Sequence, residues 1–309
     1  MTINGQTKER ACDDTTCTEN CATCPSAHQK SAQKGLPPKA IIAVKHVILV
    51  LSGKGGVGKS TVSVNLAFAL ANHGMNVGLL DLDFHGPNIP KMLGIEKQRP
   101  ALLSHGIEPV PVADNLAAMS IAFLLPDTST PVVWRGPMKM GAIRQFLSDV
   151  NWGSLDYLVV DLPPGTGDEA LTIAQIAPNV KGAVIVTTPQ DVAVMDAIKA
   201  AKFIEQLDIP VLGVIENMSG MICPHCHEEI DLFSKGGGRK AADDLGVPYL
   251  GGIPLDPEMV KAGDEGKPYI LQHTDSPTWK AVNAVMENLI DLVENRSPLQ
   301  KKQTGTGSV

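Results

Sequence analysis

Aromatic side chains and positive charge are scarce in this sequence of 309 residues, and long apolar runs are missing. Phe, Trp and Tyr together make up 4% of the residues, and the formal net charge is −7. The chain therefore lacks the basic field that non-specific nucleic-acid binders use. It has no run of about eighteen apolar residues, and residues 1–30 are polar and contain cysteine. We expect a soluble, cytoplasmic protein that binds neither nucleic acid nor a membrane.

Cysteine is also infrequent, and the six cysteines fall into two groups. The amino-terminal group consists of Cys12, Cys17, Cys21 and Cys24, and the downstream pair consists of Cys223 and Cys226. In a cytosolic protein such clusters indicate metal or redox chemistry before disulfides.

The sequence does contain many short apolar runs bounded by Gly, Pro or Asp. They are HVILVLSG, NVGLLDLD, LAAMSIA, DYLVVDLPPG, GAVIVTTPQ, IPVLGVIENM and PYLGGIPL. Such runs are typical of strands buried on both faces, as in a parallel sheet. Segments with helical spacing alternate with them, among them residues 60–73, 192–207 and 279–294. The pattern predicts an α/β fold with a doubly wound, mostly parallel sheet flanked by helices.

The predicted α/β domain covers residues 41–295, and the segments on either side of it differ in composition. Residues 1–40 are polar and contain cysteine, so we expect a flexible segment that only a metal would order. Residues 296–309 are rich in Gly, Thr, Ser and Lys and are expected to be disordered. Within the domain, residues 219–240 interrupt the alternation of strands and helices, and we expect an inserted functional loop there.

A phosphate-binding loop follows the first predicted strand. Residues 53–60 fit the pattern G-x-x-x-x-G-K-[ST] and directly precede a predicted helix, which is the context that this pattern requires. The glycines let backbone N–H groups surround phosphate oxygens, and the lysine before the serine supplies the compensating charge. The alternative is a Gly-rich turn with incidental lysines. The expected nucleotide-binding residues are Gly53, Lys54, Gly55, Gly56, Val57, Gly58, Lys59, Ser60 and Thr61.

Carboxylates after two of the strands could complete the site. Asp161 ends an apolar strand, which is typical of the carboxylate that holds Mg²⁺ with the hydroxyl of Ser60, although a turn aspartate is the simpler alternative. Asp81 and Asp83 follow another strand and would share one face while the chain stays extended. We expect Asp83 to orient the attacking water, with helix capping as the competing interpretation.

Lys54 occupies a variable position of the loop, so its side chain is expected to project away from the loop's own phosphates. The economical interpretation is a catalytic lysine donated across a dimer interface to the ATP of the partner, as an arginine finger is elsewhere. A solvated lysine is the alternative.

The stretch SGKGGVGKST resembles the deviant Walker A motif of the family that includes MinD, ParA and the nitrogenase iron protein. DLDFHGPN, VVDLPPGTGDE, VTTPQDVAVMDA, VIENMSGMICPHC and LGGIPLDP resemble its Mrp/ApbC type branch of iron–sulfur cluster carrier ATPases. The resemblance spans about residues 45–292. It implies a P-loop NTPase fold, a homodimer in which Lys54 acts in trans, and recognition of adenine by Asn217. An Asn amide can both donate to and accept from a base edge.

Cys223 and Cys226 supply two thiolates, too few for a closed zinc site or a four-cysteine cluster. A symmetric dimer would supply four. Together with the resemblance, this favours a [4Fe–4S] cluster bridging two subunits. The alternatives are zinc, with His225 or His227 as a further ligand, and a redox dithiol.

The amino-terminal cysteines could hold a second cluster within one chain, because four thiols lie within residues 12–24. Some cytosolic members of the family carry an amino-terminal cluster, but the spacing here departs from theirs. A redox-labile or zinc-binding tail is the alternative.

The sequence thus predicts an ATP-binding and ATP-hydrolysing carrier that passes an iron–sulfur cluster to apo-proteins. Its expected cofactors are ATP, Mg²⁺ and a [4Fe–4S] cluster. The competing functions are a spatial-organisation ATPase like ParA or MinD, and an electron-transfer ATPase like the nitrogenase iron protein. The acidic pI and the Cys-Pro-x-Cys stretch disfavour the first, and the adjacent cysteine pair disfavours the second.

Overall fold

The structure is a computed structural model that describes residues 39–104, 106–125, 134–223, 226 and 228–295. The amino-terminal cysteines, residues 1–38 generally, and the predicted tail at 296–309 lie outside the described residues. The described residues from Lys39 onward belong to one unit of the chain.

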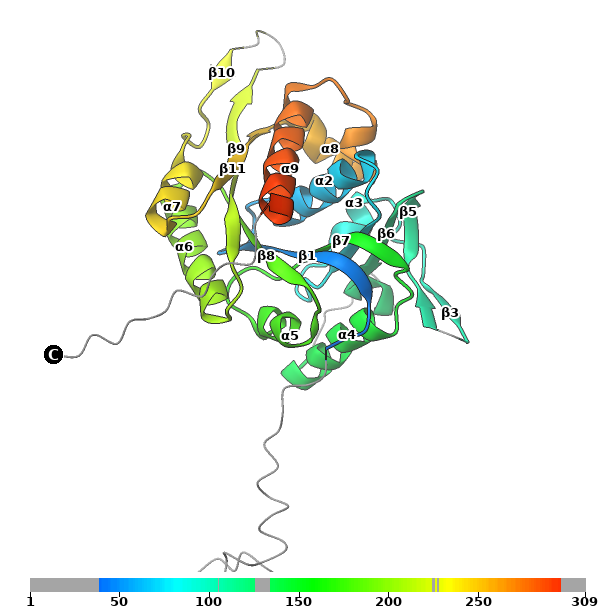
Figure 1. The fold of residues 1–309 in the computed structure, drawn as a ribbon. Coiled ribbons are helices and arrows are strands. Elements are labelled where there is room, and N and C mark those ends of the chain that lie inside the picture. Colours follow the sequence, from blue (N-terminus) through cyan, green and yellow to red (C-terminus); the bar gives the residue numbers. More distant parts are fainter. Residues whose placement is uncertain (1–38, 105, 126–133, 224–225, 227, 296–309) are drawn as a thin grey trace, which may run out of the picture. The chain divides into compact units, whose positions relative to one another are not determined.

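A mostly parallel sheet forms the centre of this unit (Figure 1). Within the described part of the chain it has nine strands in the order β10-β9-β8-β1-β7-β2-β6-β5, with β11 paired to β9. The strands are β1 (Ala43–Ser52), β2 (Val77–Asp81), β5 (Val110–Ala113), β6 (Leu116–Ser120), β7 (Ser154–Asp161), β8 (Val180–Thr187), β9 (Val211–Ile222), β10 (Glu229–Ile230) and β11 (Tyr249–Leu255). Only the edge pairs β5–β6 and β9–β10 are antiparallel. A separate antiparallel pair joins β3 (Ala101–Leu103) and β4 (Gly106–Glu108).

Helices cover both faces of the sheet. They are α2 (Lys59–Asn72), α3 (Ile89–Met92), α4 (Gly136–Ser148), α5 (Asp168–Ile176), α6 (Asp191–Gln206), α7 (Gly237–Leu245), α8 (Pro257–Glu265) and α9 (Pro277–Asn295). Figure 1 shows α2, α8 and α9 on one side of the sheet and α4, α5 and α6 on the other. This arrangement confirms the predicted α/β fold. The strands could be recognised in the sequence because strands that are buried on both faces carry apolar side chains throughout.

All seven apolar runs singled out in the sequence form strands, namely β1, β2, β6, β7, β8, β9 and β11. The three helical segments appear as α2, α6 and α9, with ends within about two residues of those expected. One face of α9 is apolar and buried, at Val282, Val285, Met286, Leu289 and Val293, whereas Ile290 is half-buried. The sequence analysis did not single out α3, α4, α5, α7 or α8.

The segment expected as an inserted loop, residues 219–240, has regular structure at both ends. Its start continues β9, which pairs antiparallel with β10 through Met221 with Ile230 and Ile222 with Glu229. Its end forms the first turn of α7. We call residues 221–230 the cysteine hairpin. Figure 1 shows β10 and the end of β9 projecting past the ends of the other parallel strands.

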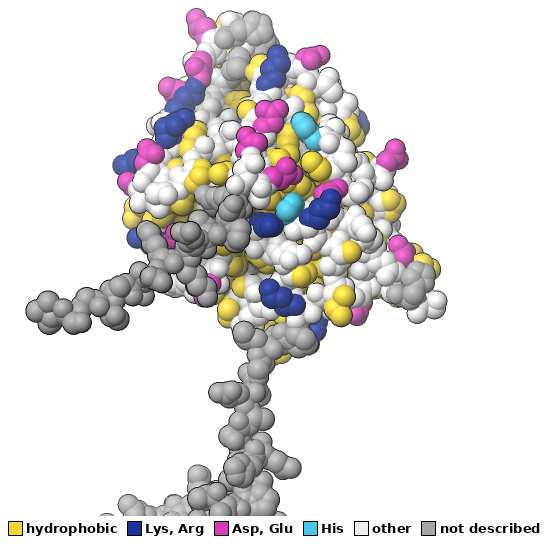
Figure 2. Space-filling model, in the orientation of Figure 1, with side chains coloured by type: hydrophobic (Ala, Val, Ile, Leu, Met, Phe, Trp, Pro, Cys, Tyr) yellow, Lys and Arg dark blue, Asp and Glu magenta, His cyan; other side chains and the backbone are white. Residues whose placement is uncertain are grey.

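Charged side chains of both signs are interspersed over the face shown in Figure 2. Among the helices of the described segments, none combines the length and the apolar character that crossing a bilayer requires.

Candidate functional site

The phosphate-binding loop connects β1 to α2 at the carboxyl end of the sheet. Lys59 is the first residue of α2, and Gly58 before it has a φ of 79°. A Cβ atom at Gly58 would lie 2.2 Å from Nδ2 of Asn217. Both the left-handed backbone and this close approach require glycine. The N-terminus of α2 directs free N–H groups toward the loop, which is the usual arrangement for binding phosphate.

Lys59 lies between two of the predicted carboxylates. Its Nζ is 2.7 Å from Oδ2 of Asp161 and 3.5 Å from Oδ2 of Asp83. Ser60 donates its hydroxyl to the same Oδ2 of Asp161 at 2.7 Å. The structure thus brings together four residues that the sequence assigned to the phosphate and metal side of the site.

Ser63 is a member of this cluster that the sequence analysis missed. Its hydroxyl donates to Oδ1 of Asp161 at 2.6 Å and is buried. Ser63 lies one helical turn after Lys59, so both project from the same face of α2. This spacing was the available signal. With Lys59 and Ser60 on one oxygen and Ser63 on the other, the orientation of the Asp161 carboxylate is fixed.

Asp81 and Asp83 have different surroundings, although they lie two residues apart. Asp81 ends β2, is fully buried, and accepts hydrogen bonds from the Ser120 hydroxyl at 2.8 Å and from the Asp83 N–H at 3.1 Å. Burial, reinforced by Asp161, raises the pKa of Asp81 to about 8. In this position the carboxyl group of Asp81 connects β2 to β6 through Ser120 and does not contact water.

Asp83 instead lines a cavity. Burial raises the pKa of Asp83, while the charge of Lys59 acts in the opposite direction. Its Oδ1 accepts from the N–H groups of His85 at 3.2 Å and Gly86 at 3.3 Å. Oδ1 therefore closes a turn, and Oδ2 faces Lys59. Asp83 does not cap a helix as the competing interpretation expected, because the N-cap of the next helix, α3, is Asn88.

Two cavities adjoin the loop. The first, of about 210 Å³, is lined by Lys54, Lys59, Ser60 and Asp83 among others. The second, of about 370 Å³, is lined by residues of α2, α3, β9 and α8. Gly58, Thr61, Asn88 and Met92 line both, so the two cavities are neighbours. A polar cavity over the loop next to a more apolar one suits the phosphates and the base of a nucleotide.

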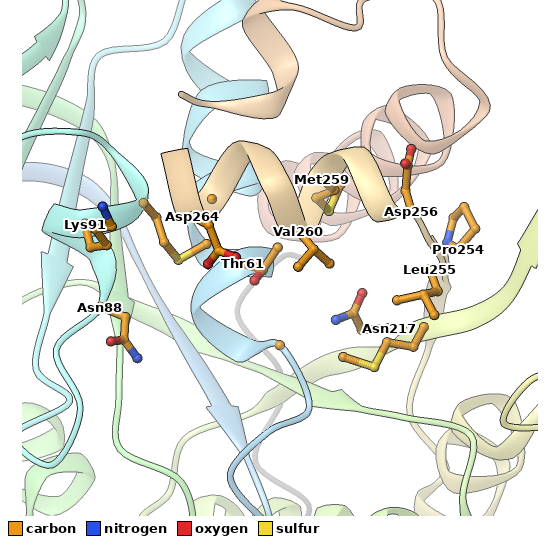
Figure 3. A pocket seen from close by; sticks show the side chains of 14 residues that line it. Thr61, Asn88, Lys91, Asn217, Pro254, Leu255, Asp256, Met259, Val260 and Asp264 are labelled. Carbon is orange, nitrogen blue, oxygen red and sulfur yellow. The ribbon is translucent and has the colours of Figure 1, made fainter. Parts of the chain in front are cut away.

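Asn217 lies on β9 at the second cavity. Its Nδ2 donates to the carbonyl of Val57 at 2.9 Å, which ties β9 to the phosphate-binding loop. Figure 3 shows α8 across the cavity from Asn217, with Val260 and Asp264 directed into it. The sequence analysis did not anticipate α8. The signal was present in Asp256-Pro257, a helix-capping aspartate followed by proline at the first helical position.

A second buried ion pair connects the segments that follow Asp83 and Asp161. Lys139 of α4 contacts Oε1 of Glu169 on α5 at 2.7 Å. The same Nζ lies 3.4 Å from Nε2 of His85 and 5.3 Å from the centre of the Phe84 ring. Lys139 therefore links the segment that follows Asp83 to the segment that follows Asp161. No motif in the sequence pointed to it, because its partners come from distant parts of the chain.

Lys54 differs from Lys59 in having no side-chain partner within the described part of the chain. Its carbonyl accepts from the Ser52 hydroxyl at 3.0 Å, and its side chain is half-buried at the first cavity. Nothing in a single chain assigns its ammonium group a role, so action in trans stays a prediction.

Cys223 and Cys226 lie in the cysteine hairpin, the first half-buried and the second exposed. The Cys223 N–H donates to the carbonyl of Glu228 at 2.9 Å, which continues the antiparallel pairing of β9 with β10. Among the residues that the structure describes, no group of three or more His, Cys, Asp or Glu side chains could hold a metal ion. His225 and His227 lie outside the described residues.

The fold and the loop define a P-loop NTPase, and comparison with known families gives the branch. Residues 43–290 match the family model described as "ParA: NUBPL iron-transfer P-loop NTPase". An iron-sulfur cluster carrier protein of Methanocaldococcus jannaschii is 50% identical over 287 residues, covering 91% of this chain and 98% of the relative. A cytosolic Fe-S cluster assembly factor NUBP2 homolog of Nematostella vectensis is 48% identical, covering 82% and 95%. The chain belongs to this family of iron-transfer P-loop NTPases.

Solved structures agree with this assignment. A nucleotide-binding protein of Archaeoglobus fulgidus in complex with ADP is 41% identical, with a TM-score of 0.66 over 77% of this chain and 91% of that one. The cell-division ATPase MinD of Pyrococcus furiosus has a TM-score of 0.61 at 24% identity, covering 80% of this chain and 99% of that one, and shares the fold.

Proposed function

We propose that this chain binds and hydrolyses ATP and carries a [4Fe–4S] cluster, held between two copies of the chain, to apo-proteins. Relatives at about half identity are named iron-sulfur cluster carrier proteins and span nearly the whole chain. The observation that carries the proposal is the position of the cysteine pair. Cys223 directly follows β9, the strand that also bears Asn217 at the nucleotide cavity.

The ligand count supports a dimer. One chain offers two thiolates in the hairpin, and a [4Fe–4S] cluster requires four. Two hairpins related by two-fold symmetry would supply them. Because Cys226 is exposed, a second copy can approach it directly. Thiolate ligands also suit zinc, so the metal itself must be identified by experiment.

The nucleotide chemistry follows from the residues around the loop. Lys59 and the loop N–H groups would bind the phosphates. The adenosine would be bound by Asn217 and the walls of the larger cavity. Ser60 offers a hydroxyl oxygen and Asp161 a carboxylate oxygen. Mg²⁺ prefers such hard oxygen ligands, so these two residues are suited to hold it. Bound Mg²⁺ would neutralise developing phosphate charge. Asp83, with Oδ2 at the cavity, would orient the attacking water.

Lys54 would complete the site of the partner. Its half-buried side chain lines the mouth of the phosphate cavity without a partner among the described residues. A lysine contributed by a second copy would stabilise charge in the transition state only when the dimer has formed. Hydrolysis and cluster binding would then require the same assembly.

The test is anaerobic reconstitution with iron and sulfide in full-length protein. Iron and sulfide per chain, the absorption spectrum and the mass of the assembly would be measured. The parent would be compared with a variant in which Cys223 and Cys226 are Ser, and with a variant in which Cys12, Cys17, Cys21 and Cys24 are Ser.

We expect the variant lacking the downstream pair to lose the bridging cluster and acceptor activation, and the variant lacking the amino-terminal group to keep both. If the downstream variant still loads iron and activates an apo-protein while the amino-terminal variant does not, the hairpin is not the cargo site. A monomeric protein carrying a full cluster would contradict the shared site.

A further inference from the structure

Glu216 is a buried carboxylate that the nucleotide chemistry and the cargo site do not use. It lies on β9, between Thr187 of β8 and Gly252 of β11, and is 1% exposed. A buried carboxylate costs free energy unless hydrogen-bond donors compensate it. The hydrogen-bond donors around Glu216 therefore indicate its structural role.

Both oxygens of Glu216 hold the ends of the segment that contains the cysteine hairpin. Oε1 accepts from the hydroxyl of Ser219 at 2.5 Å and from the N–H of Gly236 at 3.1 Å. Oε2 accepts from the N–H of Gly238 at 2.5 Å. Ser219 lies two residues before the hairpin, and Gly236 and Gly238 lie six and eight residues after it. A single side chain thus holds positions of the chain on both sides of the hairpin.

The N–H groups of Gly236 and Gly238 also belong to the start of α7, where backbone donors lack partners within the helix. A carboxylate there satisfies them and interacts favourably with the helix dipole. The approach is close, because a Cβ at Gly238 would lie 2.7 Å from Cβ of Glu216. This contact explains the glycine at position 238, while the close approach of the Pro189 carbonyl explains Gly237.

Asn217, the next residue, reaches the nucleotide site. Consecutive residues of a strand point to opposite faces, so the Glu216 and Asn217 side chains leave β9 on opposite sides. Asn217 donates to the carbonyl of Val57 in the phosphate-binding loop at 2.9 Å. Two adjacent residues of one strand therefore connect the nucleotide loop with the base of the cysteine hairpin.

The backbone between these residues and the hairpin is strained. Met218 has a φ of 57° and Gly220 a φ of 70°, which places both in the left-handed region. A non-glycine residue there is strained and persists only where its surroundings enforce it. Here the surroundings are Asn217, fixed by the loop, and Ser219, fixed by Glu216. A change on either side can therefore alter how the hairpin leaves the sheet.

We propose that Glu216 is a positioning residue through which a nucleotide in the phosphate-binding loop sets the arrangement of Cys223 and Cys226. The inference rests on the proposed function only in taking this pair as the cargo site. Phosphates that order the loop would fix the Val57 carbonyl, Asn217 and the neighbouring Glu216, and with them both ends of the hairpin. Ordering the hairpin lowers the frequency of local opening at its cysteines.

Thiol reactivity tests this coupling without any metal. The starting protein is the full chain with Cys12, Cys17, Cys21 and Cys24 replaced by Ser, so that only Cys223 and Cys226 react. Their rate of reaction with dithiobis(nitrobenzoate) is measured with and without saturating ADP, which excludes hydrolysis. We expect ADP to slow the reaction of half-buried Cys223 by about fivefold or more, whereas exposed Cys226 reacts in a separate, faster phase.

Glu216→Gln keeps the size of the side chain but places an amide N–H₂ against backbone donors. We expect the ADP effect to shrink to about twofold or less in this variant. Its ADP affinity should stay within about threefold of the starting protein. Ser219→Ala removes one of the bonds and should give a smaller reduction of the ADP effect. Glu287→Gln, at an exposed position of α9, is the matched control and should keep the full effect.

Three results would overturn the proposal: no slowing by ADP in the starting protein, an undiminished ADP effect in Glu216→Gln, or loss of ADP binding in that variant. Circular dichroism and thermal unfolding of each variant verify folding, and Ser219→Ala keeps the test valid if Glu216→Gln does not fold. Iron loading of the same starting protein is measured in parallel. A chain that takes no iron but keeps the Glu216-dependent ADP effect would refute the cargo function and leave the coupling in place.

Discussion

At the scale of single residues, Lys59 and Lys54 share a loop but differ in their contacts. Lys59 is buried against Asp161 and Asp83, whereas Lys54 has no side-chain partner among the described residues. We expect Lys59→Ala to lower ATP affinity by about 100-fold or more, since it removes a charge-assisted contact with the phosphates and leaves Asp161 without its partner.

Lys54→Ala should leave ATP binding within about threefold of the parent and lower hydrolysis by about 10³-fold, the lower end of the range for residues donated in trans. Equilibrium binding and phosphate release measure the two quantities separately. Equal loss of binding in both variants would show that Lys54 serves its own loop.

The two carboxylates near Lys59 are expected to fail in different ways. Asp161→Asn should weaken Mg²⁺ retention, so that raised magnesium partly restores turnover. Asp83→Asn should lower turnover by about 10²–10⁴-fold without rescue, because the positioned acceptor for the water is lost. The measurement is the rate of phosphate release over a magnesium titration. Normal turnover in Asp83→Asn would show that Asp83 does not orient the attacking water.

His46 gives the fold a pH dependence remote from the site. Its ring packs on Tyr157 with centroids 5.0 Å apart, and its Nδ1 is buried with no hydrogen-bond partner within the described residues. Burial lowers the pKa of His46, with a further contribution from Lys181. The unfolded chain therefore takes up the proton first as pH falls below about 6.5, and stability decreases from there downward.

His46→Phe keeps the ring contact and removes the titration. Below about pH 6.5 we expect the melting temperature of the variant to depend less on pH than that of the parent. The two melting temperatures should differ by no more than the ~2–4 °C that corresponds to 1 kcal/mol in a large domain. Melting curves of parent and variant between about pH 5 and 8 measure this. Parallel curves would show that His46 is protonated equally in both states.

At the scale of elements, α8 forms a wall of the larger cavity and depends on one aspartate. Asp256 accepts from the Glu258 N–H at 2.9 Å, from the Tyr269 hydroxyl at 2.5 Å and from the Thr278 hydroxyl at 2.8 Å. It thus caps α8 and ties it to the start of α9. The position of this wall is fixed by a side chain that lies beside the cavity.

Asp256→Ala should lower stability by about 1–2 kcal/mol, the usual cost of a lost helix cap, and weaken ADP binding because the wall shifts. Asp264→Ala, from the same wall but without a capping role, should leave the melting temperature unchanged. Thermal unfolding and ADP titration of both variants make the comparison. An unchanged melting temperature in Asp256→Ala would show that Pro257 and packing suffice to start α8.

At the scale of the whole molecule, the nucleotide site and the cysteine pair belong to the same α/β unit, and the amino-terminal segment lies outside the described residues. Deleting residues 1–35 should therefore leave ATP hydrolysis, dimer mass and the bridging cluster within about twofold of the full chain. Cys226→Ala in the full chain should abolish the bridging cluster, since it would remove one ligand from each copy. Iron and sulfide per dimer are the measurement, and a deletion variant without iron would place the cargo in the tail.

The sequence alone determined the sheet and the phosphate-binding loop. Both are encoded locally: buried parallel strands need apolar runs, and a loop that wraps phosphate needs glycines at fixed positions before a lysine. For that reason β1, the residues from Gly53 to Thr61 and the start of α2 could be read directly from their order. Asp83 and Asp161 could be proposed because parallel strands bring their carboxyl ends to one edge.

Only the tertiary structure decided which polar side chains meet. Ser63 with Asp161, Lys139 with Glu169 and His85, and Glu216 with Gly236 and Gly238 come from separate elements or from a helix face whose partner is remote. It also distinguished Asp81 from Asp83, because burial against Ser120 depends on β6 lying beside β2. Such contacts have no fixed spacing in the chain. They arise from packing between segments, which a pattern of neighbouring residues does not encode.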